Sequence, residues 1–480
     1  MNRLLPHFLK VSSSDLGIDS KMRIRTIRSE GLAALSYFVS SGSEAMVVDP
    51  RRDAAIYHQI ADGEGVEITH IFETHRNEDL VIGSLELKNL LPEARICHSN
   101  QTNFKYGDDH LADGETFVIG NMHVTCLQTP GHTLDSVCYA VGDRSVGSDP
   151  IVAFTGDTLF VNEVGRTDLV DIKKHEEMSR KLYNSLHETV LSLGDGVVIH
   201  PGHGAGSVCG GNIGEREFST IGFEKKHNVW LNMHEDEFVA SKLNQHLTRA
   251  PYFKHCEYLN TIGPPVLAEL PEPIDLDIDE FNRLLQDEGH RAIDTRPPSE
   301  YLRRHIPDSI SLSLANMGLL AGWALRPDQT FSFILSDGQS DLILASSMLY
   351  RIGYDNIIGY LKNGLDQWVG SGRKPGFIEE ISLDDLEAKY ARHELQVIDV
   401  REPHEFSVEH IGQSVSLPLT GLEESSKGFH ATIPVTPVCP SGFRSATAAS
   451  ILKRRGVNDI VVNLDGLKAW KDHGYPLEVT

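Results

Sequence analysis

Cysteine is scarce in this chain of 480 residues, and long apolar runs are missing. The six cysteines are spread over the whole length, which excludes a tight disulfide framework and favours reduced thiols in a cytoplasm. They are Cys97, Cys126, Cys138, Cys209, Cys256 and Cys439. No apolar stretch approaches the roughly 18 residues of a membrane span. The opening segment, residues 1–7, carries one basic residue and no sustained apolar core, so we expect no secretory signal.

Basic residues are also in deficit, with 44 Lys and Arg against 68 Asp and Glu, which gives a net charge of −24. Nucleic acids and anionic membranes both bind basic surfaces, so this balance disfavours both as partners. We therefore expect small-molecule ligands, no nucleic acid and no membrane contact. We also expect a homo-oligomer.

The length predicts about three domains. After an N-terminal extension (1–21), residues 22–262 alternate strand-like apolar runs with turn residues, and Lys174 to Leu191 has the pattern of an amphipathic helix. Residues 263–273 are too rich in proline for a helix and are predicted to form a linker.

The sequence after the linker repeats. Ile293-Asp294-Thr295-Arg296 returns as Ile398-Asp399-Val400-Arg401, and Gly364 and Trp368 return as Gly466 and Trp470. The offset drifts only from 105 to 102 residues, so we interpret 274–375 and 378–480 as two copies of one domain. Strands that alternate with helices within each copy predict a mostly parallel sheet covered on both faces.

The second copy contains the loop Cys439-Pro440-Ser441-Gly442-Phe443-Arg444, between an apolar strand and a helix that starts near Ser445. Backbone N–H groups of such a loop converge on one point, and the helix dipole adds positive potential there. We therefore expect Cys439 to be a reactive thiolate, with Arg444 as a fixed charge at the rim.

Four residues separate this cysteine from the arginine, whereas tyrosine phosphatases use five to enclose a phosphate. The shorter loop resembles that of the rhodanese (sulfurtransferase) family. The resemblance implies that Cys439 carries a persulfide sulfur between thiols. In the first copy Ser336 and Asp341 stand at the positions of Cys439 and Arg444, which predicts a rhodanese-like domain without sulfurtransferase activity.

The first domain carries four motifs in which a His or Asp follows a strand-like run. They are Thr74-His75-Arg76-Asn77-Glu78-Asp79-Leu80, Thr129-Pro130-Gly131-His132-Thr133, Phe154-Thr155-Gly156-Asp157-Thr158, and His200-Pro201-Gly202-His203-Gly204. The series resembles the metallo-β-lactamase superfamily and implies an αββα sandwich. The expected fold class is therefore multidomain α/β, a metallo-β-lactamase sandwich followed by two rhodanese-like domains.

The chain departs from that family's two-metal pattern. Asn77 and Leu80 stand where the hydrolases have histidines, so the second metal site keeps only Asp79, His203 and the bridging Asp157. The first site keeps His75, His132 and Asp157, the two histidines and one carboxylate typical of non-haem Fe(II). This set resembles the persulfide dioxygenase branch, as does the segment 160–169, and implies one Fe(II) per chain.

Other residues have less specific expectations. Asn77 and Asp79 are predicted to orient the metal ligands, although a plain hydrogen-bonding role is equally consistent. His203 and Arg166 are placed either behind the metal ligands, in contact with them, or in the substrate pocket. Cys209, in a glycine-rich loop after His203, is either a second persulfide carrier or an inert small residue.

Together the motifs resemble a persulfide dioxygenase fused to rhodanese domains. This implies that a low-molecular-weight thiol persulfide and O₂ react to give sulfite, with sulfur transfer that forms or uses thiosulfate. Two alternatives stay open: a thioester hydrolase of glyoxalase II type, and a protein without a catalytic metal in which only Cys439 reacts.

Overall fold

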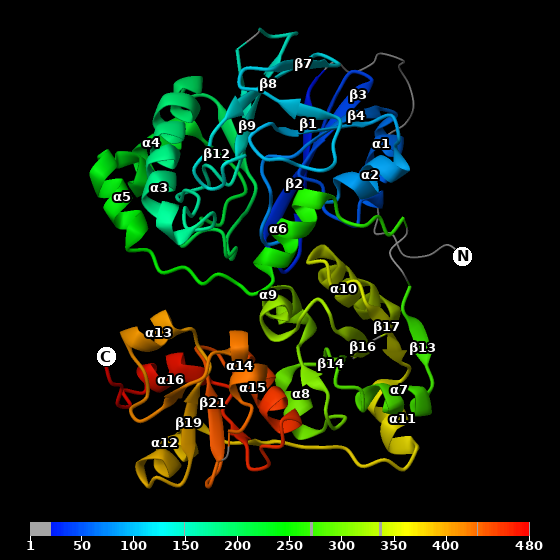
Figure 1. Cartoon of the computed structure of the whole chain (residues 1–480), viewed down its shortest axis with the longest axis vertical. Coiled ribbons are helices and arrows are strands. Elements are labelled where there is room, and N and C mark those ends of the chain that lie inside the picture. The colour runs from blue at the N-terminus through cyan, green and yellow to red at the C-terminus, as the bar shows by residue number, and fades with distance from the viewer. Residues whose placement is uncertain (1–20, 148, 269–271, 336–337, 430, 480) are drawn as a thin grey trace.

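The computed structural model describes residues 21–479 apart from residues 148, 269–271, 336–337 and 430. Figure 1 shows a large domain in blue to green at the top and two smaller domains below it. The first small domain is green to yellow, and the second is orange to red. Ser336 lies outside the described residues. None of the helices in the described ranges has the length and apolar character of a membrane span.

Two six-stranded sheets packed face to face form the core of the large domain. The first consists of β1 (Arg23–Ser29), β2 (Ala34–Ser41), β3 (Glu44–Val48), β4 (Glu67–Phe72), β5 (Arg95–Ser99) and β6 (Asp109–Leu111), in this order. The second has the order β12-β11-β10-β9-β8-β7. Its strands are β7 (Thr116–Ile119), β8 (Met122–Gln128), β9 (Val137–Asp143), β10 (Val152–Gly156), β11 (Val198–Pro201) and β12 (Ser219–Thr220).

Side chains alternate along these strands and so supply both faces of each sheet. In β2, Tyr37 and Val39 pack against the second sheet, whereas Phe38 packs toward the helices of the first sheet. Helices α1 (Ala55–Glu64) and α2 (Ser84–Leu90) cover the first sheet, and α3 (His175–Asn184), α4 (Ile221–His227) and α5 (Glu235–Leu243) cover the second. The predicted αββα sandwich is confirmed.

The helix predicted over 174–191 is present, and its second half, Ser185–Val190, is π-helical. Short 3₁₀ turns cover Ile172–Lys174, Leu191–Leu193 and Val229–Asn232. Helix α6 (Phe253–Ile262) ends the domain and lies above the first small domain in Figure 1.

The first small domain has a five-stranded parallel sheet, in the order β13 (Ile274–Leu276), β17 (Ile357–Leu361), β16 (Thr330–Ile334), β14 (His290–Asp294) and β15 (Ile310–Ser311). Its helices are α7 (Ile278–Leu285), α8 (Pro298–Arg303), α9 (Leu314–Ala324), α10 (Gly338–Arg351) and α11 (Gly364–Gly370). Asp341 lies in the first turn of α10.

The second small domain repeats this plan. Its strands are β20 (Val415–Ser416), β19 (Gln396–Asp399) and β21 (Val435–Val438), with the pair β18 (Glu379–Glu380) and β22 (Val461–Val462) beside them. Its helices are α12 (Leu383–Ala391), α13 (Pro403–Val408), α14 (Leu422–Ser425), α15 (Phe443–Arg454) and α16 (Gly466–Asp472), with a 3₁₀ turn at Leu419–Gly421. Trp470 donates to a carbonyl six residues on at 3.0 Å, as Trp368 does at 3.1 Å in the first copy. The predicted duplication is confirmed.

The three domains pack through one continuous apolar cluster, which includes Leu80, Met317 and Leu452. Where the large domain meets the first small domain, Arg52 is buried and donates to the carbonyl of Tyr350 at 2.9 Å. Two glycine backbones also meet closely at this junction. A Cβ on Gly318 of α9 would lie 2.4 Å from the Cα of Gly31. The surfaces where the two domains meet are therefore buried and closely packed.

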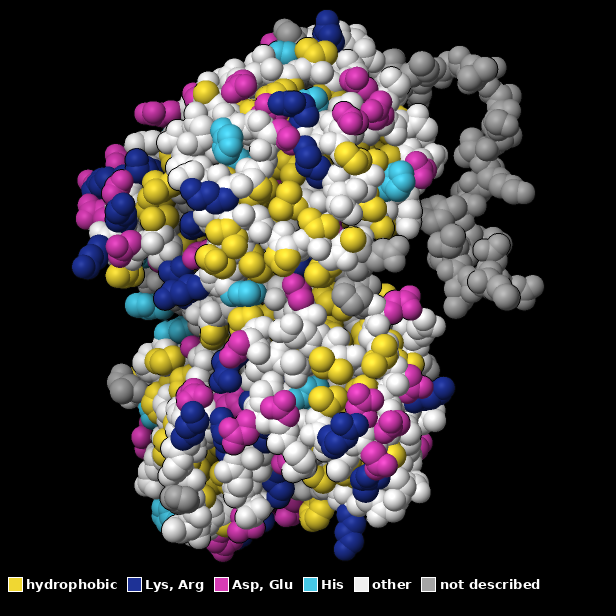
Figure 2. Space-filling view, turned by 45° about the vertical axis from the view of Figure 1, so that its right-hand side comes forward, with side chains coloured by type: hydrophobic (Ala, Val, Ile, Leu, Met, Phe, Trp, Pro, Cys, Tyr) yellow, Lys and Arg dark blue, Asp and Glu magenta, His cyan; other side chains and the backbone are white. Residues whose placement is uncertain are grey.

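All six cysteines are buried, and none forms a disulfide in this structure. On the face shown in Figure 2, acidic and basic side chains are interspersed over the upper and lower domains. No broad basic area gathers there among the residues that the structure describes.

Candidate metal centre and thiolate loop

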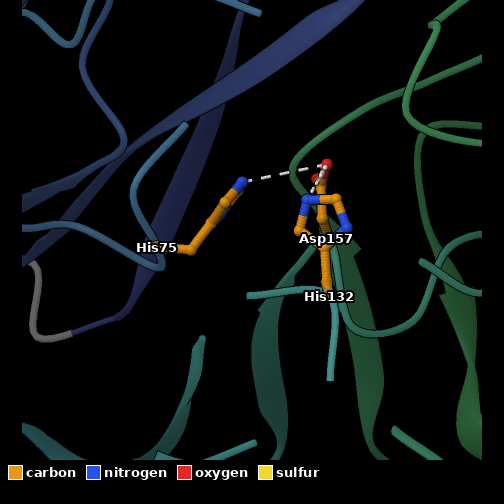
Figure 3. A group of neighbouring side chains, drawn as sticks. All are labelled: His75, His132 and Asp157. Atoms are coloured by element: carbon orange, nitrogen blue, oxygen red, sulfur yellow. Dashed lines mark ion pairs between the residues drawn. The ribbon is translucent and has the colours of Figure 1, made fainter. Parts of the chain in front are cut away.

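The four His and Asp motifs of the large domain all end on one edge of its two sheets. His75 follows β4 of the first sheet, whereas His132, Asp157 and His203 follow β8, β10 and β11 of the second. Figure 3 shows His75 pointing across the seam toward His132 and Asp157. The donor atoms of these three side chains lie within 4.8 Å of one another. The structure therefore brings together the three residues predicted to hold the metal.

Asp157 lies at the centre of this group. Its Oδ2 is 3.5 Å from His132 Nε2 and 3.9 Å from His75 Nε2. The backbone of Gly202 passes directly behind it, and a Cβ at that position would lie 2.6 Å from Asp157 Oδ1. A glycine is needed there because any side chain would displace the carboxylate.

Hydrogen bonds behind the two histidines fix their tautomers. His132 Nδ1 is 3.0 Å from the carbonyl of Arg166, which can only accept, so Nδ1 carries the proton. His75 Nδ1 is 2.9 Å from the hydroxyl of Thr74, whose proton goes to Asp49 at 2.6 Å, so Nδ1 again donates. Both Nε2 atoms point into the site and have no hydrogen-bond partner among the described residues. Buried imidazole nitrogens without a partner, next to a carboxylate, fit a metal ion that would displace any proton on them.

Glu78 is a fourth donor that the sequence analysis did not single out. Its Oε2 is 3.3 Å from His132 Nε2 and 4.0 Å from His75 Nε2, and has no hydrogen-bond partner among the described residues. The only available signal was its position three residues after His75. A glutamate in a loop is too common for that spacing to point to a metal.

The buried carboxylates and histidines strongly polarise one another. Burial lowers the pKa of His132, but Glu78 and Asp157 outweigh it and raise the pKa to about 9. Burial raises the pKa of Glu78, but His132 and His75 hold it well below its usual range. The buried carboxylates thus stabilise a positive charge in this pocket, and a metal cation would supply it.

Cys209 also lies at this site, in the loop that follows His203. Its Sγ donates to Glu78 Oε1 at 3.2 Å, and the side chain is fully buried. Burial, together with Asp79 and Glu78, raises the pKa of this thiol well above its usual value. As it stands, Cys209 is therefore protonated and poorly suited to act as a nucleophile.

The two residues expected to orient the metal ligands have different surroundings. The side-chain amide of Asn77 donates to the backbone carbonyl of His75 at 3.3 Å. The backbone carbonyl of Asn77 accepts from the side chain of Asn260 at 2.8 Å, and the two bonds stabilise the loop. Asp79 turns inward, and its Oδ2 faces His203 Nε2 at 3.0 Å. His203 Nδ1 in turn donates to Asp157 Oδ1 at 2.8 Å. His203 and Asp79 thus lie among the donor atoms.

Of the two positions considered for Arg166, the structure has it behind the metal ligands, where its carbonyl binds His132. Its guanidinium forms two 2.7 Å bonds to Asp168 and donates to the carbonyls of Val208, Leu247 and Thr248 at 3.1 Å. All five of its N–H groups are engaged, and the side chain is 1% exposed. Arg166 therefore holds the Cys209 loop in place and has no donor left for a substrate.

The loop of residues 439–442 in the second small domain connects β21 to α15, and Cys439 is its first residue. Gly442 adopts φ +79°, which lets the loop turn into the helix. The amide of Leu467 binds the carbonyl of Cys439 at 2.8 Å and fixes the back of the loop. Phe443 is 43% exposed and faces solvent beside the cysteine.

Arg444 does not present a free charge at the rim. Its two Nη atoms form a bidentate pair with Glu405 of α13, at 2.7 and 2.8 Å. Bidentate pairing fixes the orientation of the guanidinium and offsets part of its charge. Glu405 was not identified from the sequence, because 39 residues separate it from Arg444.

A family model described as a rhodanese-like domain matches this chain twice, at residues 277–371 and 382–473. The N-terminal half is similar to persulfide dioxygenases. It is 29% identical to the mitochondrial ETHE1 persulfide dioxygenase of Bos taurus over 208 residues, which cover 42% of this chain and 72% of the relative. A probable hydroxyacylglutathione hydrolase of Schizosaccharomyces pombe is 32% identical over 164 residues, which cover 33% and 59% of the two chains.

Among solved structures, a metallo-β-lactamase from Staphylococcus aureus superposes with a TM-score of 0.63 at 28% identity. The match covers 71% of this chain and 98% of the other. Residues 21–262 are only about half of the chain, so the similarity extends beyond the large domain.

The fold and the site define a metallo-β-lactamase-fold metal domain joined to two rhodanese-like domains. The chain thus combines a domain similar to the persulfide dioxygenases with two rhodanese-like domains.

Proposed function

We propose that this protein is an iron-dependent persulfide dioxygenase with a sulfurtransferase domain. The observation that carries the proposal is the buried group of His75, His132 and Asp157, with both Nε2 atoms directed into one site. Two histidines and one carboxylate are the ligand set typical of Fe(II) sites that react with O₂. We expect one Fe(II) per chain.

The overall reaction is RSSH + O₂ + H₂O → RSH + SO₃²⁻ + 2H⁺. The terminal sulfur loses four electrons, which O₂ takes up, and the thiol leaves with its own sulfur unchanged. When bound, the iron supplies the binding and activation of O₂ and of the terminal sulfur. His75, His132 and Asp157 would hold the iron, and Glu78 lies close enough to join them.

The chain's own residues prepare this site. The Thr74–Asp49 pair and the Arg166 carbonyl hold the two imidazoles with their Nε2 atoms inward. Burial of every donor excludes bulk water, which protects a reactive persulfide from hydrolysis and exchange.

Cys439 provides the sulfur-transfer step. Its thiolate attacks the outer sulfur of a persulfide, which gives a Cys439 persulfide and releases RSH. That persulfide can pass its outer sulfur to sulfite, which yields thiosulfate and restores the thiolate. The Arg444–Glu405 pair orients the rim of the loop on which these anions bind.

A second candidate is thioester hydrolysis, which the similarity to a probable hydroxyacylglutathione hydrolase favours. That chemistry uses two metals that share an activated water. In this structure Asp157 Oδ1 binds His203 Nδ1, and Leu80 packs into the apolar cluster at the domain junction. We therefore expect little hydrolysis of S-lactoylglutathione, even after zinc loading.

The test is oxygen uptake and sulfite release with glutathione persulfide, measured together with iron content. We expect His132→Ala to lose both iron and oxygen uptake, and His123→Ala, outside the donor group, to keep both. Normal oxygen uptake by His132→Ala would show that the ligand assignment is wrong. Robust thioester hydrolysis by the unmodified protein would favour the second candidate.

A further inference from the structure

We propose that Asn260 of α6 and the C-terminal end of α10 in the first small domain position the loop between β4 and α2 that faces the metal centre. Residues 75–82 of this loop, the metal loop, carry the side chains of His75, Glu78 and Asp79. The inference rests on the proposed function only in that a metal ion binds there. It gives the first small domain, whose copy of the thiolate loop has no cysteine, a direct part in the metal centre.

The metal loop depends on its neighbours for its shape. Residues 75–82 belong to no helix or strand and make one isolated bridge, between Ile82 and Arg51. All of them except Arg76 are buried. Buried backbone N–H and C=O groups need hydrogen-bond partners, because leaving them unpaired costs free energy. Without a regular ladder of its own, the loop takes such partners from other elements.

The side chain of Asn260 supplies three of these partners. Its amide nitrogen donates to the carbonyls of Asn77 at 2.8 Å and Leu80 at 2.7 Å. Its amide oxygen accepts from the N–H of Ile82 at 2.9 Å. Both amide protons and the amide oxygen are thus used, and Asn260 is 1% exposed. The three bonds fix the loop on both sides of its two carboxylate side chains.

The end of α10 supplies a fourth partner, and this one comes from another domain. The carbonyl of Arg351, the last residue of α10, accepts from the N–H of Val81 at 2.7 Å. The guanidinium of Arg351 in turn binds Asp53 at 2.9 and 3.1 Å and Glu30 at 3.1 Å, both in the large domain. The first small domain therefore binds the metal loop directly.

Helix α6 and the end of α10 also bind each other. His255 Nε2 donates to the carbonyl of Gly353 at 3.1 Å, and the Cys256 thiol donates to the carbonyl of Ile352 at 3.6 Å. Gly353 packs so closely that a Cβ on it would lie 2.9 Å from His255 Nε2 and 3.0 Å from Val81 Cγ2. The metal loop, α6 and the end of α10 therefore form one packed group.

Asn260 acts on the metal centre through the backbone of the loop. Its three bonds go to backbone groups, so it is a positioning residue and not a ligand. Metal affinity depends on how well the ligand atoms are placed, and removing a group that orients them typically costs about 10- to 100-fold in affinity. A change at Asn260 should therefore alter metal binding without changing any donor atom.

The test is titration of Co²⁺ into the full chain after its metal has been removed with a chelator. The visible ligand-field absorption of Co²⁺ reports both its affinity and its coordination geometry. We expect Asn260→Ala to bind Co²⁺ at least about 10-fold more weakly, with a changed absorption band. Asn463→Ala is the matched control, since this buried asparagine also bonds to backbone groups, in the second small domain. It should destabilise the protein to urea but keep the Co²⁺ affinity and band of the unmodified protein.

Gly353→Ala tests the contribution of the first small domain. Gly456 holds the same place in the second copy, and both glycines have a left-handed backbone, with φ +75° and +89°. An added methyl group would meet Val81 and α6 at Gly353, whereas nothing lies within 4 Å of one at Gly456. Gly353→Ala should therefore weaken Co²⁺ binding several-fold. Gly456→Ala carries similar backbone strain and should bind Co²⁺ as the unmodified protein does.

The outcomes separate this inference from the proposed function. Unchanged Co²⁺ affinity and absorption in Asn260→Ala would overturn the role of Asn260. If that variant does not fold, the two glycine variants decide, and equal Co²⁺ affinities in them would overturn the role of the small domain. Expected cobalt results from a protein that consumes no oxygen with iron and a persulfide would contradict only the proposed function.

Discussion

Asp157 and His203 lie 2.8 Å apart, joined by a hydrogen bond from Nδ1 to the carboxylate oxygen that does not face His75 and His132. The same nitrogen lies 3.1 Å from the other carboxylate oxygen, so Asp157 holds His203 while it faces the proposed metal position. A small displacement of Asp157 should therefore disturb both sides of the pocket at once.

Gly202→Ala tests that sensitivity. A Cβ there would lie 2.6 Å from Asp157 Oδ1, so the carboxylate must move. We expect iron affinity to fall at least about 10-fold, measured as iron retained after dialysis against a chelator. Gly196→Ala is the matched control, since nothing lies within 4 Å of its new methyl group. Equal iron retention in the two variants would contradict the role given to Asp157.

Cys439→Ser tests the assignment of the transfer step. The loop then lacks its nucleophile, so sulfur transfer from thiosulfate or a persulfide to an acceptor should fall to background. Oxygen uptake on a small persulfide should persist, because the proposed iron site lies in another domain. Mass spectrometry after persulfide treatment should find added sulfur on Cys439 of the unmodified protein. Continued transfer by the variant would place the reactive thiol elsewhere.

Glu405→Gln tests the charge at the rim. The amide can keep the hydrogen bond to the backbone of Glu402 but no longer neutralises Arg444. We expect the KM for thiosulfate to fall several-fold, because the anion gains a less compensated guanidinium. Glu409→Gln, at an ion pair with Lys471 away from the loop, should leave KM unchanged. A higher KM in Glu405→Gln would mean that Glu405 acts mainly by orienting Arg444.

Acid stability should depend on His290, which is buried at the start of β14 and hydrogen-bonded to Thr330 and Ser332. Burial lowers its pKa to about 4. The unfolded chain therefore binds more protons between about pH 4 and 6.5, so the stabilisation is complete above that range and is lost as pH falls through it.

His290→Gln removes this titration. Between pH 7 and pH 4 the variant should lose about 3 kcal/mol less unfolding free energy than the unmodified protein, as measured by urea denaturation. His473→Gln changes an exposed histidine and is the control. Equal losses in the unmodified protein and in His290→Gln would rule out His290 as a source of acid sensitivity.

The sequence predicted those parts of the site that depend on strand ends. His75, His132 and Asp157 each follow a strand of a recognisable sandwich, and strands that end on one edge bring such side chains together. The duplicated small domains were equally predictable, because Gly364 and Trp368 recur at a nearly constant offset as Gly466 and Trp470.

Contacts between loops were not predictable in this way. Glu78 and Cys209 are in contact because two loops separated by 131 residues fold against each other. The spacing of apolar residues along the sequence predicts helices and strands but not a contact of this kind. The same holds for Arg166, whose five hydrogen bonds go to a neighbouring carboxylate and to backbone carbonyls that have no sequence signature.

The contact between Gly31 and Gly318 has a consequence for how sulfur moves. The backbones touch where any side chain larger than hydrogen would drive α9 away from the large domain. The large domain and α9 of the first small domain are therefore held in close contact. If this contact persists during turnover, we expect sulfur to pass between Cys439 and the proposed iron site on a diffusible thiol.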